Sequence, residues 1–255
     1  MLARFAGRSE PIAPRATSIV VAHPDDETIG AGSLLGALDG AVLLHVTDGS
    51  PKDESDARRA GCGTGHEYAL LRRRELERAL EFAGARHLRM RSLGIRDQDA
   101  VHHLADLARE LSSVFESCGT EVVLTHPFEG GHPDHDAIAF AVRSACALLE
   151  HRGRRAPAIL EMTSYHASAA DGGTMATGVF LPGIGSRGSV HQLSEAAREI
   201  KRELYACFAS QRSVLGAFRH DIERFRPAPS YSFEEPPHAG SLFYETFAHG
   251  ATREL

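Results

Sequence analysis

A histidine and three carboxylates stand close together near the start of the chain, in the stretch His23-Pro24-Asp25-Asp26-Glu27. Such side chains are costly to bury unless they bind a cation or transfer protons. The stretch follows residues 17–21, a β-branched run that predicts a buried strand, and precedes the small and apolar residues 28–38, which predict a helix. Because sites on open α/β sheets lie where strands end, this stretch predicts a functional site.

A second cluster, His132-Pro133-Asp134-His135, has the same setting, after a predicted strand (121–126) and at the start of a predicted helix (133–151). Its two histidines are three residues apart, so they point to one side of the helix start. The proline suits the first helical position, where its missing N–H would be unpaired anyway. Since parallel strands end on one edge of a sheet, the two clusters can meet there.

Together the clusters offer His23, Asp26 and His135 as nitrogen and oxygen ligands. Three such ligands with an open position are typical of a catalytic zinc site rather than a structural one. Asp25 is then left over, close to the metal but free of it, where a general base is expected.

These paired motifs closely resemble those of the LmbE-like, or PIG-L, family of metal-dependent N-deacetylases. The predicted order of strands and helices agrees with that family over about residues 17–166. The resemblance implies that His23, Asp26 and His135 bind one zinc ion per chain and that Asp25 is the base.

The resemblance also assigns roles around these ligands. It implies that His132 stabilises the tetrahedral oxyanion and that Asp134 orients or charges this histidine. Arg72 and Asp97 fall where relatives hold sugar hydroxyls, so they are predicted to bind substrate. Gly130 stands where some relatives have a tyrosine, so no tyrosine role in the oxyanion site is carried over.

The implied reaction is hydrolysis of an N-acetyl group on an N-acetylglucosamine-type amino sugar or its conjugate. Zinc and Asp25 would deprotonate a water, the hydroxide would attack the acetyl carbonyl, and zinc and His132 would hold the oxyanion. The same motifs would serve a zinc amidase that cleaves a larger acyl or thiol conjugate. A sugar-binding relative without catalysis is a further alternative, although binding alone does not need Asp25.

The stretch Gly30-Ala31-Gly32 suggests a different class, a nucleotide-binding oxidoreductase or methyltransferase. These glycines lie inside the predicted helix, after an acidic turn that would repel phosphate at the helix N-terminus. We therefore interpret them as small residues for close helix–sheet packing.

Strands and helices are predicted to alternate, which favours a Rossmann-like three-layer α/β sandwich with a mostly parallel sheet. Continuous apolar runs such as 41–47 suit strands that are covered on both faces. The other predicted strands are 87–90 and 158–166, and the other predicted helices are 66–83, one ending near 118, 193–209 and 214–225.

We expect a flexible tail over residues 1–16 and a single domain over 17–255, with its core at about 17–166 and a C-terminal extension at 167–255. The chain has 255 residues, 42% of them apolar, and a net charge of −6, which argues against nucleic acid as a partner. No apolar run approaches the roughly 20 residues of a membrane span. Four scattered cysteines and no predicted secretory signal favour a cytoplasmic enzyme. We expect a small-molecule substrate, and the sequence leaves open whether the protein forms a homo-oligomer.

Overall fold

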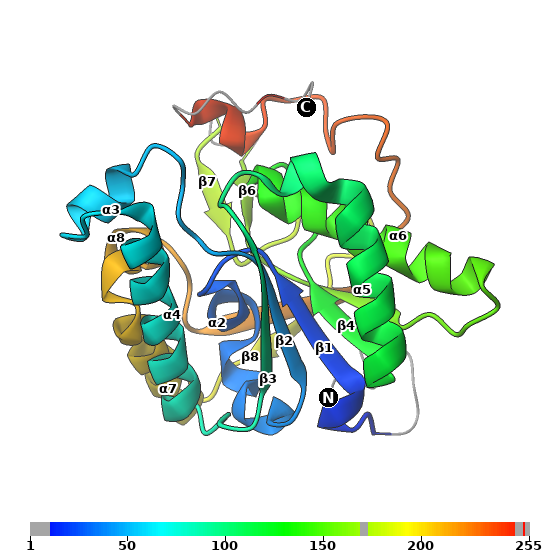
Figure 1. Cartoon of the computed structure of the whole chain (residues 1–255), viewed down its shortest axis with the longest axis horizontal. Helices are drawn as coiled ribbons and strands as arrows, with labels where there is room; N and C mark the ends of the chain where they lie inside the picture. The colour runs from blue at the N-terminus through cyan, green and yellow to red at the C-terminus, as the bar shows by residue number, and fades with distance from the viewer. Residues whose placement is uncertain (1–10, 169–172, 248–251, 253–255) are drawn as a thin grey trace.

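A mostly parallel sheet of seven strands forms the centre of the protein (Figure 1). The computed structural model describes residues 11–168, 173–247 and 252. The strands lie in the order β3-β2-β1-β4-β5-β9-β8. The first five are parallel to one another, whereas β9 pairs antiparallel with both of its neighbours, β5 and β8. Their bounds are β1 (Thr17–Val21), β2 (Val42–Thr47), β3 (Arg89–Ile95), β4 (Val122–Thr125), β5 (Ala158–Met162), β8 (Ser189–Gln192) and β9 (Ile222–Pro227).

Helices cover both faces of this sheet, so the three-layer α/β sandwich expected from the sequence is confirmed (Figure 1). One face carries α2 (Asp26–Ala31), α4 (Gly65–Phe82), α7 (Glu195–Cys207) and α8 (Arg212–Leu215), and the other carries α5 (Leu104–Cys118) and α6 (Pro133–His151). Alternate residues of β1 supply the two cores: Ile19 packs with the first group and Val20 with the second. All five residues of β1 are buried, as its continuous apolar run predicts.

The carboxyl ends of β1 and β4 lie side by side, because these strands pair in parallel with Ile19 opposite Leu124. From β1 the chain first builds β2 and β3 on one side and then crosses to β4 on the other. Open α/β sheets bind ligands at such a reversal of strand order. The two clusters of acids and histidines follow these two strands.

The helix predicted over 28–38 is broken into α2 and the 3-10 turns η2 (Gly32–Leu34) and η3 (Gly36–Leu38). Its glycines allow close packing: a Cβ on Gly30 would lie 2.4 Å from the Met162 sulfur, and one on Gly36 would lie 2.5 Å from the Ala83 carbonyl oxygen. Protein atoms thus occupy the space beside these glycines, in agreement with their interpretation as packing residues.

The chain after β5 differs most from expectation. The predicted helix 214–225 is wrong, because α8 ends at Leu215 and residues Ile222–Pro227 form β9. The strand predicted over 158–166 is divided into β5 and β6 (Tyr165–Ala167), and β6 forms a separate hairpin with β7 (Met175–Thr177). β9 pairs with β5 and β8, so the C-terminal third extends the sheet.

The remaining elements are short. They are η1 (Pro14–Ala16), α3 (Ser55–Arg59), η4 (Ala100–His103), η5 (Ala209–Gln211) and η6 (Phe243–Thr246). Of the stretch expected to be a tail, residues 1–10 lie outside the described residues, whereas Ile12 packs against the core.

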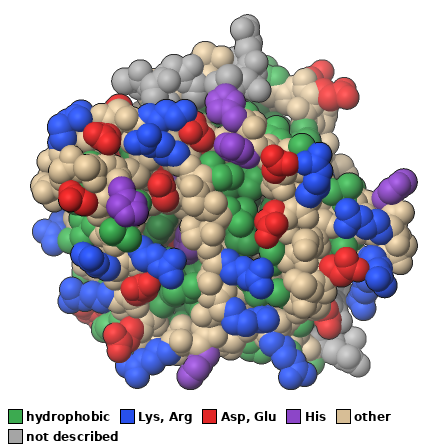
Figure 2. Space-filling view, in the orientation of Figure 1, with side chains coloured by type: hydrophobic (Ala, Val, Ile, Leu, Met, Phe, Trp, Pro, Cys, Tyr) green, Lys and Arg blue, Asp and Glu red, His purple; other side chains and the backbone are tan. Residues whose placement is uncertain are grey.

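The surface mixes both signs of charge: on the face drawn in Figure 2, Lys and Arg side chains are interspersed with Asp and Glu. Among the described helices, none combines the length and the apolar character that crossing a bilayer requires.

Candidate active site

The turn after β1 holds Asp25 in an uncommon backbone conformation. Its φ is 137°, a region that residues other than glycine rarely adopt. The Asp25 carbonyl accepts hydrogen bonds from the backbone nitrogens of Thr28 and Ile29, and the Asp25 nitrogen donates to Glu27 Oε2 at 3.2 Å. Such strain persists only where the surroundings impose it, and here it places a buried carboxylate directly before α2.

The loop between β4 and α6 is folded back onto its own helix. Asp136 Oδ1 accepts hydrogen bonds from the backbone nitrogens of Glu129 and Gly130, both at 3.1 Å. Gly131 passes so close to β6 that a Cβ there would lie 2.0 Å from the Tyr165 carbonyl oxygen. These contacts fix the position of His132, which caps α6 by accepting a hydrogen bond on Nδ1 from the Asp134 nitrogen at 3.2 Å.

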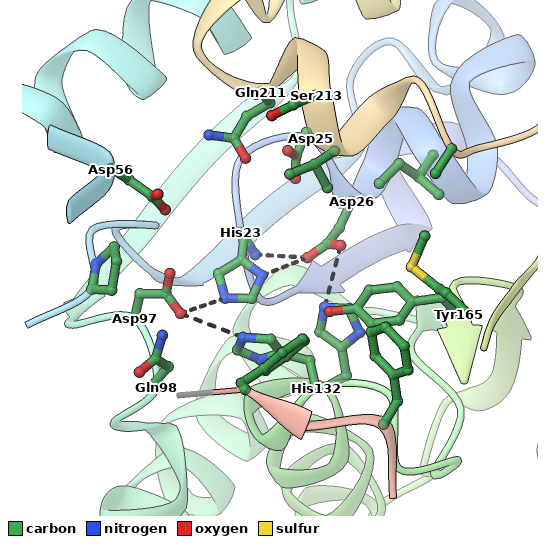
Figure 3. Close-up of a pocket in the computed structure, with 18 of the residues that line it drawn as sticks. His23, Asp25, Asp26, Asp56, Asp97, Gln98, His132, Tyr165, Gln211 and Ser213 are labelled. Atoms are coloured by element: carbon green, nitrogen blue, oxygen red, sulfur yellow. Dashed lines mark hydrogen bonds and ion pairs between the residues drawn. The ribbon is translucent and has the colours of Figure 1, made fainter. Parts of the chain in front are cut away.

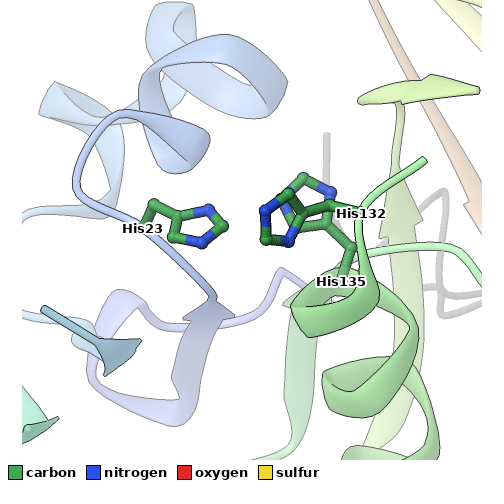
Figure 4. Close-up of side chains that lie close together, drawn as sticks. All are labelled: His23, His132 and His135. Atoms are coloured by element: carbon green, nitrogen blue, oxygen red, sulfur yellow. The ribbon is translucent and has the colours of Figure 1, made fainter. Parts of the chain in front are cut away.

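The two turns bring three histidines together from opposite sides (Figure 4). The His23 ring lies 4.6 Å from that of His132 and 5.5 Å from that of His135, measured between ring centroids. His23 Nε2 also lies 3.1 Å from Asp97 Oδ1 and 3.2 Å from Asp134 Oδ2. All five of these side chains are buried.

Asp26 joins the predicted ligands. Its Oδ2 lies 3.3 Å from His23 Nδ1, and its Oδ1 lies 3.3 Å from His135 Nε2. The His126 ring stacks on that of His135 at 3.8 Å, and its Nε2 lies 3.4 Å from Asp26 Oδ2. The side chains of His23, Asp26 and His135 are therefore neighbours, as predicted. His126, the last residue of the predicted strand 121–126 and so a candidate to line the site, is a further nitrogen beside them.

The donor set fits a divalent cation such as zinc, which binds imidazole nitrogens and carboxylate oxygens. Three overlapping groups have ligand atoms within 4.8 Å of one another, namely His23/His132/His135, His23/Asp97/His132/Asp134 and Asp26/His126/His135. His135 Nε2 is buried without a hydrogen-bond partner. The predicted set His23/Asp26/His135 takes members from two of these groups and is not itself one of the three.

Burial and neighbouring charges shift the pKa values of these acids. Burial raises the pKa of Asp25 to about 8, although Arg72 opposes the shift. For Asp26 burial acts in the same upward direction, but His135 and His126 outweigh it and lower the pKa well below its usual range. The pKa values of these two adjacent carboxyls are thus shifted in opposite directions. Asp26 is held ionised beside the histidines, and Asp25 has the raised pKa of a candidate proton acceptor.

The pKa values of two of the histidines, His23 and His132, are also shifted in opposite directions. Burial opposes a charge on His23, but Asp97, Asp134 and Asp26 outweigh it and raise its pKa well above the usual value. For His132, burial and the neighbouring His23 lower the pKa to about 3, against the pull of Asp134. The hydrogen bond that His132 Nδ1 accepts places the proton of the neutral ring on Nε2. With this lowered pKa, His132 would act as a neutral donor, and the role of Asp134 in orienting or charging the ring stays a prediction.

Arg72 lines the cavity but is mainly engaged by the chain itself. It donates from Nη1 to the Gly49 carbonyl at 3.0 Å, and from Nη2 to the Pro24 carbonyl at 2.6 Å and to Asp25 Oδ2 at 3.0 Å. Arg72 thus fixes the turn that carries the candidate base. Substrate contact by Arg72 and Asp97 stays a prediction, and both residues line the cavity.

A cavity of about 670 Å3 opens over these residues. Figure 3 shows Asp56, Asp97 and Gln98 on one side of His23, and Tyr165 on the other. The cavity thus contains buried acids, imidazoles and a buried arginine in one place, which is suited to activating a water and to stabilising negative charge on a carbonyl oxygen.

Sequence reasoning gave no role to Glu27 or His45. Glu27 is fully buried, and its Oε2 accepts a hydrogen bond from the Asp25 nitrogen and lies 3.0 Å from His45 Nε2. His45 is buried, and this contact with Glu27 satisfies its Nε2. The available signals were the place of Glu27 within the first motif and the place of His45 near the end of the neighbouring strand.

The chain is similar in sequence to proteins of one family. The family model for PIG-L, described as GlcNAc-PI de-N-acetylase, matches residues 18–146. A curated relative, Probable N-acetyl-alpha-D-glucosaminyl L-malate deacetylase 2 of Bacillus subtilis (strain 168), is 31% identical over 131 residues, which are 49% of this chain and 57% of the relative. The chain thus matches little more than half the length of that curated relative.

Solved structures share the fold over most of the chain. The A40926 pseudoaglycone deacetylase Dbv21 is similar with a TM-score of 0.63 and 22% identity, covering 86% of this chain and all of that one. GalB, the 4-carboxy-2-hydroxymuconate hydratase of Pseudomonas putida KT2440, is similar with a TM-score of 0.59 and 16% identity, covering 85% of this chain and 97% of that one. Because this fold carries both a deacetylase and a hydratase, the reaction has to be argued from the site.

Proposed function

Because the chain belongs to the PIG-L (LmbE-like) family, we propose that it is a metal-dependent hydrolase that removes an N-acetyl group from an N-acetylglucosamine-type amino sugar or glycoconjugate. The family description and the name of the Bacillus subtilis relative both specify deacetylation of an N-acetylglucosaminyl compound. The observation that carries the proposal is the pair Asp25 and Asp26, which face one cavity with His23, His132 and His135.

His23, Asp26 and His135 would hold one zinc ion per chain. Bound there, zinc would supply Lewis acidity and lower the pKa of a water. Asp25 is bonded to Arg72 and has a raised pKa, so it is suited to take a proton from that water and to return it to the leaving amine.

His132 would donate from Nε2 to the carbonyl oxygen as negative charge develops on it. Its ring is held by the hydrogen bond from the Asp134 nitrogen, and the Asp134 carboxylate is in turn held by the backbone nitrogens of Gln98 and Ala100. Asp134 is therefore proposed as a positioning residue. Arg72 and Asp97 are proposed to contact the sugar at the cavity wall.

The function is tested by assaying amine release from a panel of N-acetylated sugars and glycoconjugates, with zinc added and with chelator. We expect release that depends on zinc, with acetate as the second product. Elemental analysis should find about one zinc per chain, and His135→Ala should lose it. Full zinc occupancy in His135→Ala would show that the ligand set is wrong. If the zinc-loaded protein releases no amine from the panel but hydrates an unsaturated acid, the reaction resembles that of the hydratase neighbour instead.

A further inference from the structure

The cavity has two chemically different ends. At one end the lining side chains are charged or polar, namely Asp53, Ser55, Asp56, Arg59, Asp97 and Gln98. At the other end most are apolar or aromatic, namely Tyr165, Met175, Val214, Ala217, Phe218 and Phe243, with Ser213 and Thr246 next to them in the chain. The candidate catalytic histidines lie between the two ends (Figure 3).

Four rings form a continuous surface at the apolar end, which we call the aromatic wall: Tyr165, Phe218, Phe243 and Phe247. Tyr165 lies 5.8 Å from Phe218 and 5.6 Å from Phe243, and Phe243 lies 5.4 Å from Phe247, between ring centroids. These spacings are those of packed aromatic rings. All four side chains line the cavity, so they present apolar surface to whatever fills it.

The wall begins at the candidate catalytic histidines. The Tyr165 ring lies 5.5 Å from that of His135, and the Phe247 ring lies 6.1 Å from that of His132. Tyr165 is the first residue of β6, and Phe247 directly follows η6, so the C-terminal extension supplies part of this side of the site. A group attached to a carbon that reacts beside these histidines would therefore lie next to the wall.

An amide carbon carries an oxygen, a nitrogen and an acyl chain. In the proposed reaction the oxygen faces His132 and the nitrogen faces Asp25, which α4 holds through Arg72. The third substituent, the acyl chain, is left to face the aromatic wall. Sugar hydroxyls need hydrogen-bond partners, which the polar end offers in Asp97, Gln98 and Asp56, so the sugar and whatever is attached to it belong at that end.

We propose, on the basis of the proposed function, that the aromatic wall is an acyl-chain subsite and that the enzyme accepts N-acyl chains several carbons long as well as acetyl, the shortest. An acetyl group has a single methyl group to bury. The wall, together with Met175 and Val214, offers apolar surface for several methylene groups beyond it.

The first test measures binding to the metal-free protein, so that it does not depend on turnover. Calorimetry would give the Kd of N-acetyl-, N-butanoyl-, N-hexanoyl- and N-octanoylglucosamine. We expect binding to tighten by about fourfold for each added methylene until the wall is filled, the effect of burying one methylene group. A Kd that is unchanged or weakened by chain length would overturn the subsite.

Substitutions at the two ends of the cavity then test where the acyl chain binds. Met175→Gln keeps side-chain length and Phe243→Gln removes a ring, and both place a polar amide in the apolar end, so each should reduce the octanoyl-to-acetyl affinity ratio severalfold. Met175→Leu is the matched control and should keep the ratio. Asp56→Asn, at the polar end, should change affinity for every chain length by the same factor. If the octanoyl-to-acetyl affinity ratio changes in Asp56→Asn and not in the two glutamine variants, the acyl chain binds at the polar end and the proposal fails.

A second series separates the acyl chain from the aglycone. Alkyl glycosides of N-acetylglucosamine carry the same methylene groups on the other side of the sugar. If binding tightens with their length and not with acyl length, the wall holds the aglycone and the proposal fails.

The failure of this inference is distinguishable from failure of the function. If the zinc-loaded protein releases no amine from any N-acylglucosamine while the Kd still falls with acyl length, the hydrolase proposal fails and the subsite stands. If amine is released from the acetyl compound while the Kd does not change with length, the hydrolase stands and the subsite fails.

Discussion

The Glu27 carboxylate accepts a hydrogen bond from the Asp25 backbone nitrogen at 3.2 Å, which ties the third acid of the motif to the first. Its other contacts are Thr28 Oγ1 at 2.7 Å and His45 Nε2 at 3.0 Å. Glu27 faces protein on every side and is not among the residues that line the cavity. It therefore acts by holding Asp25 in its strained conformation.

Replacing Glu27 by Ala should release that turn. We expect kcat to fall by about tenfold or more with KM within a few-fold, because a misplaced base affects the reacting geometry more than ground-state binding. Steady-state kinetics with the zinc-loaded protein measure this split. Glu27→Gln keeps an oxygen acceptor for the Asp25 nitrogen and should restore much of kcat, whereas an equal loss in both variants would argue against a positioning role.

Asp25→Asn should keep zinc and lose on the order of a hundredfold or more in kcat, the loss typical of a removed general base. The amide preserves size and still accepts a hydrogen bond from Arg72, so the turn should stay intact. Elemental analysis and kinetics on the same sample check both halves of the expectation. Near-normal turnover with zinc retained would remove Asp25 from the mechanism.

His132→Ala should keep zinc, lower kcat by roughly 10²–10³-fold and leave KM within a few-fold. The reason is that a donor to a developing oxyanion strengthens its bond as charge appears. His132→Gln, which offers an amide N–H near the position of Nε2, is the matched variant and should retain more activity than alanine. If His132→Ala instead raises KM strongly with kcat unchanged, the residue binds substrate and the oxyanion role is wrong.

Stability should depend on pH through Glu129. Burial raises the pKa of Glu129 to about 8, although Arg226, 3.0 Å away, opposes the shift and must also serve Glu161. The folded protein therefore holds this proton more tightly than the unfolded chain, so the stabilisation is full below about pH 4.5 and is lost as pH rises to about 8.

Glu129→Gln should remove that contribution, which is at most about 1.4 kcal/mol per pH unit for one proton. Urea unfolding between pH 5 and pH 8 would show a smaller decline of the unfolding free energy in Glu129→Gln than in the parent. Glu234→Gln, an exchange of an exposed acid, is the control and should leave the parent slope unchanged. Identical slopes in the parent and in Glu129→Gln would mean that Glu129 is ionised at neutral pH.

The fold could be predicted where the sequence pattern of a segment matches the burial of that segment in the structure. Residues 17–21 and 41–47 are rich in β-branched and apolar residues and form β1 and β2. Both motifs stand at strand ends, so the sequence predicts the sandwich and the meeting of the two clusters. The family assignment is confirmed, whereas the individual roles of the site residues stay predictions.

The C-terminal third was not predictable in the same way. Strand β9 contains Glu223 and Arg226, which look like surface residues of a helix. Both are buried because partners distant in sequence satisfy them: Lys201 lies 2.9 Å from Glu223, and Glu161 lies 2.6 Å from Arg226. Local pattern carries no information about such partners. The aromatic wall was hidden for the same reason, since its members lie up to 82 residues apart, from Tyr165 to Phe247.

Arg226 of β9 also reaches the loop before His132, where it donates a hydrogen bond to Glu129. Removing it would leave the buried side chains of Glu129 and Glu161 without the partner they share, and loss of one member of a buried ion pair typically costs about 3–5 kcal/mol. A chimaera that exchanges the variable C-terminal segment of one relative for that of another would therefore have to carry the residue at position 129 with the one at 226. These two residues must be transferred together although they are far apart in sequence. A chimaera joined at the end of the matched family region, after residue 146, would separate them.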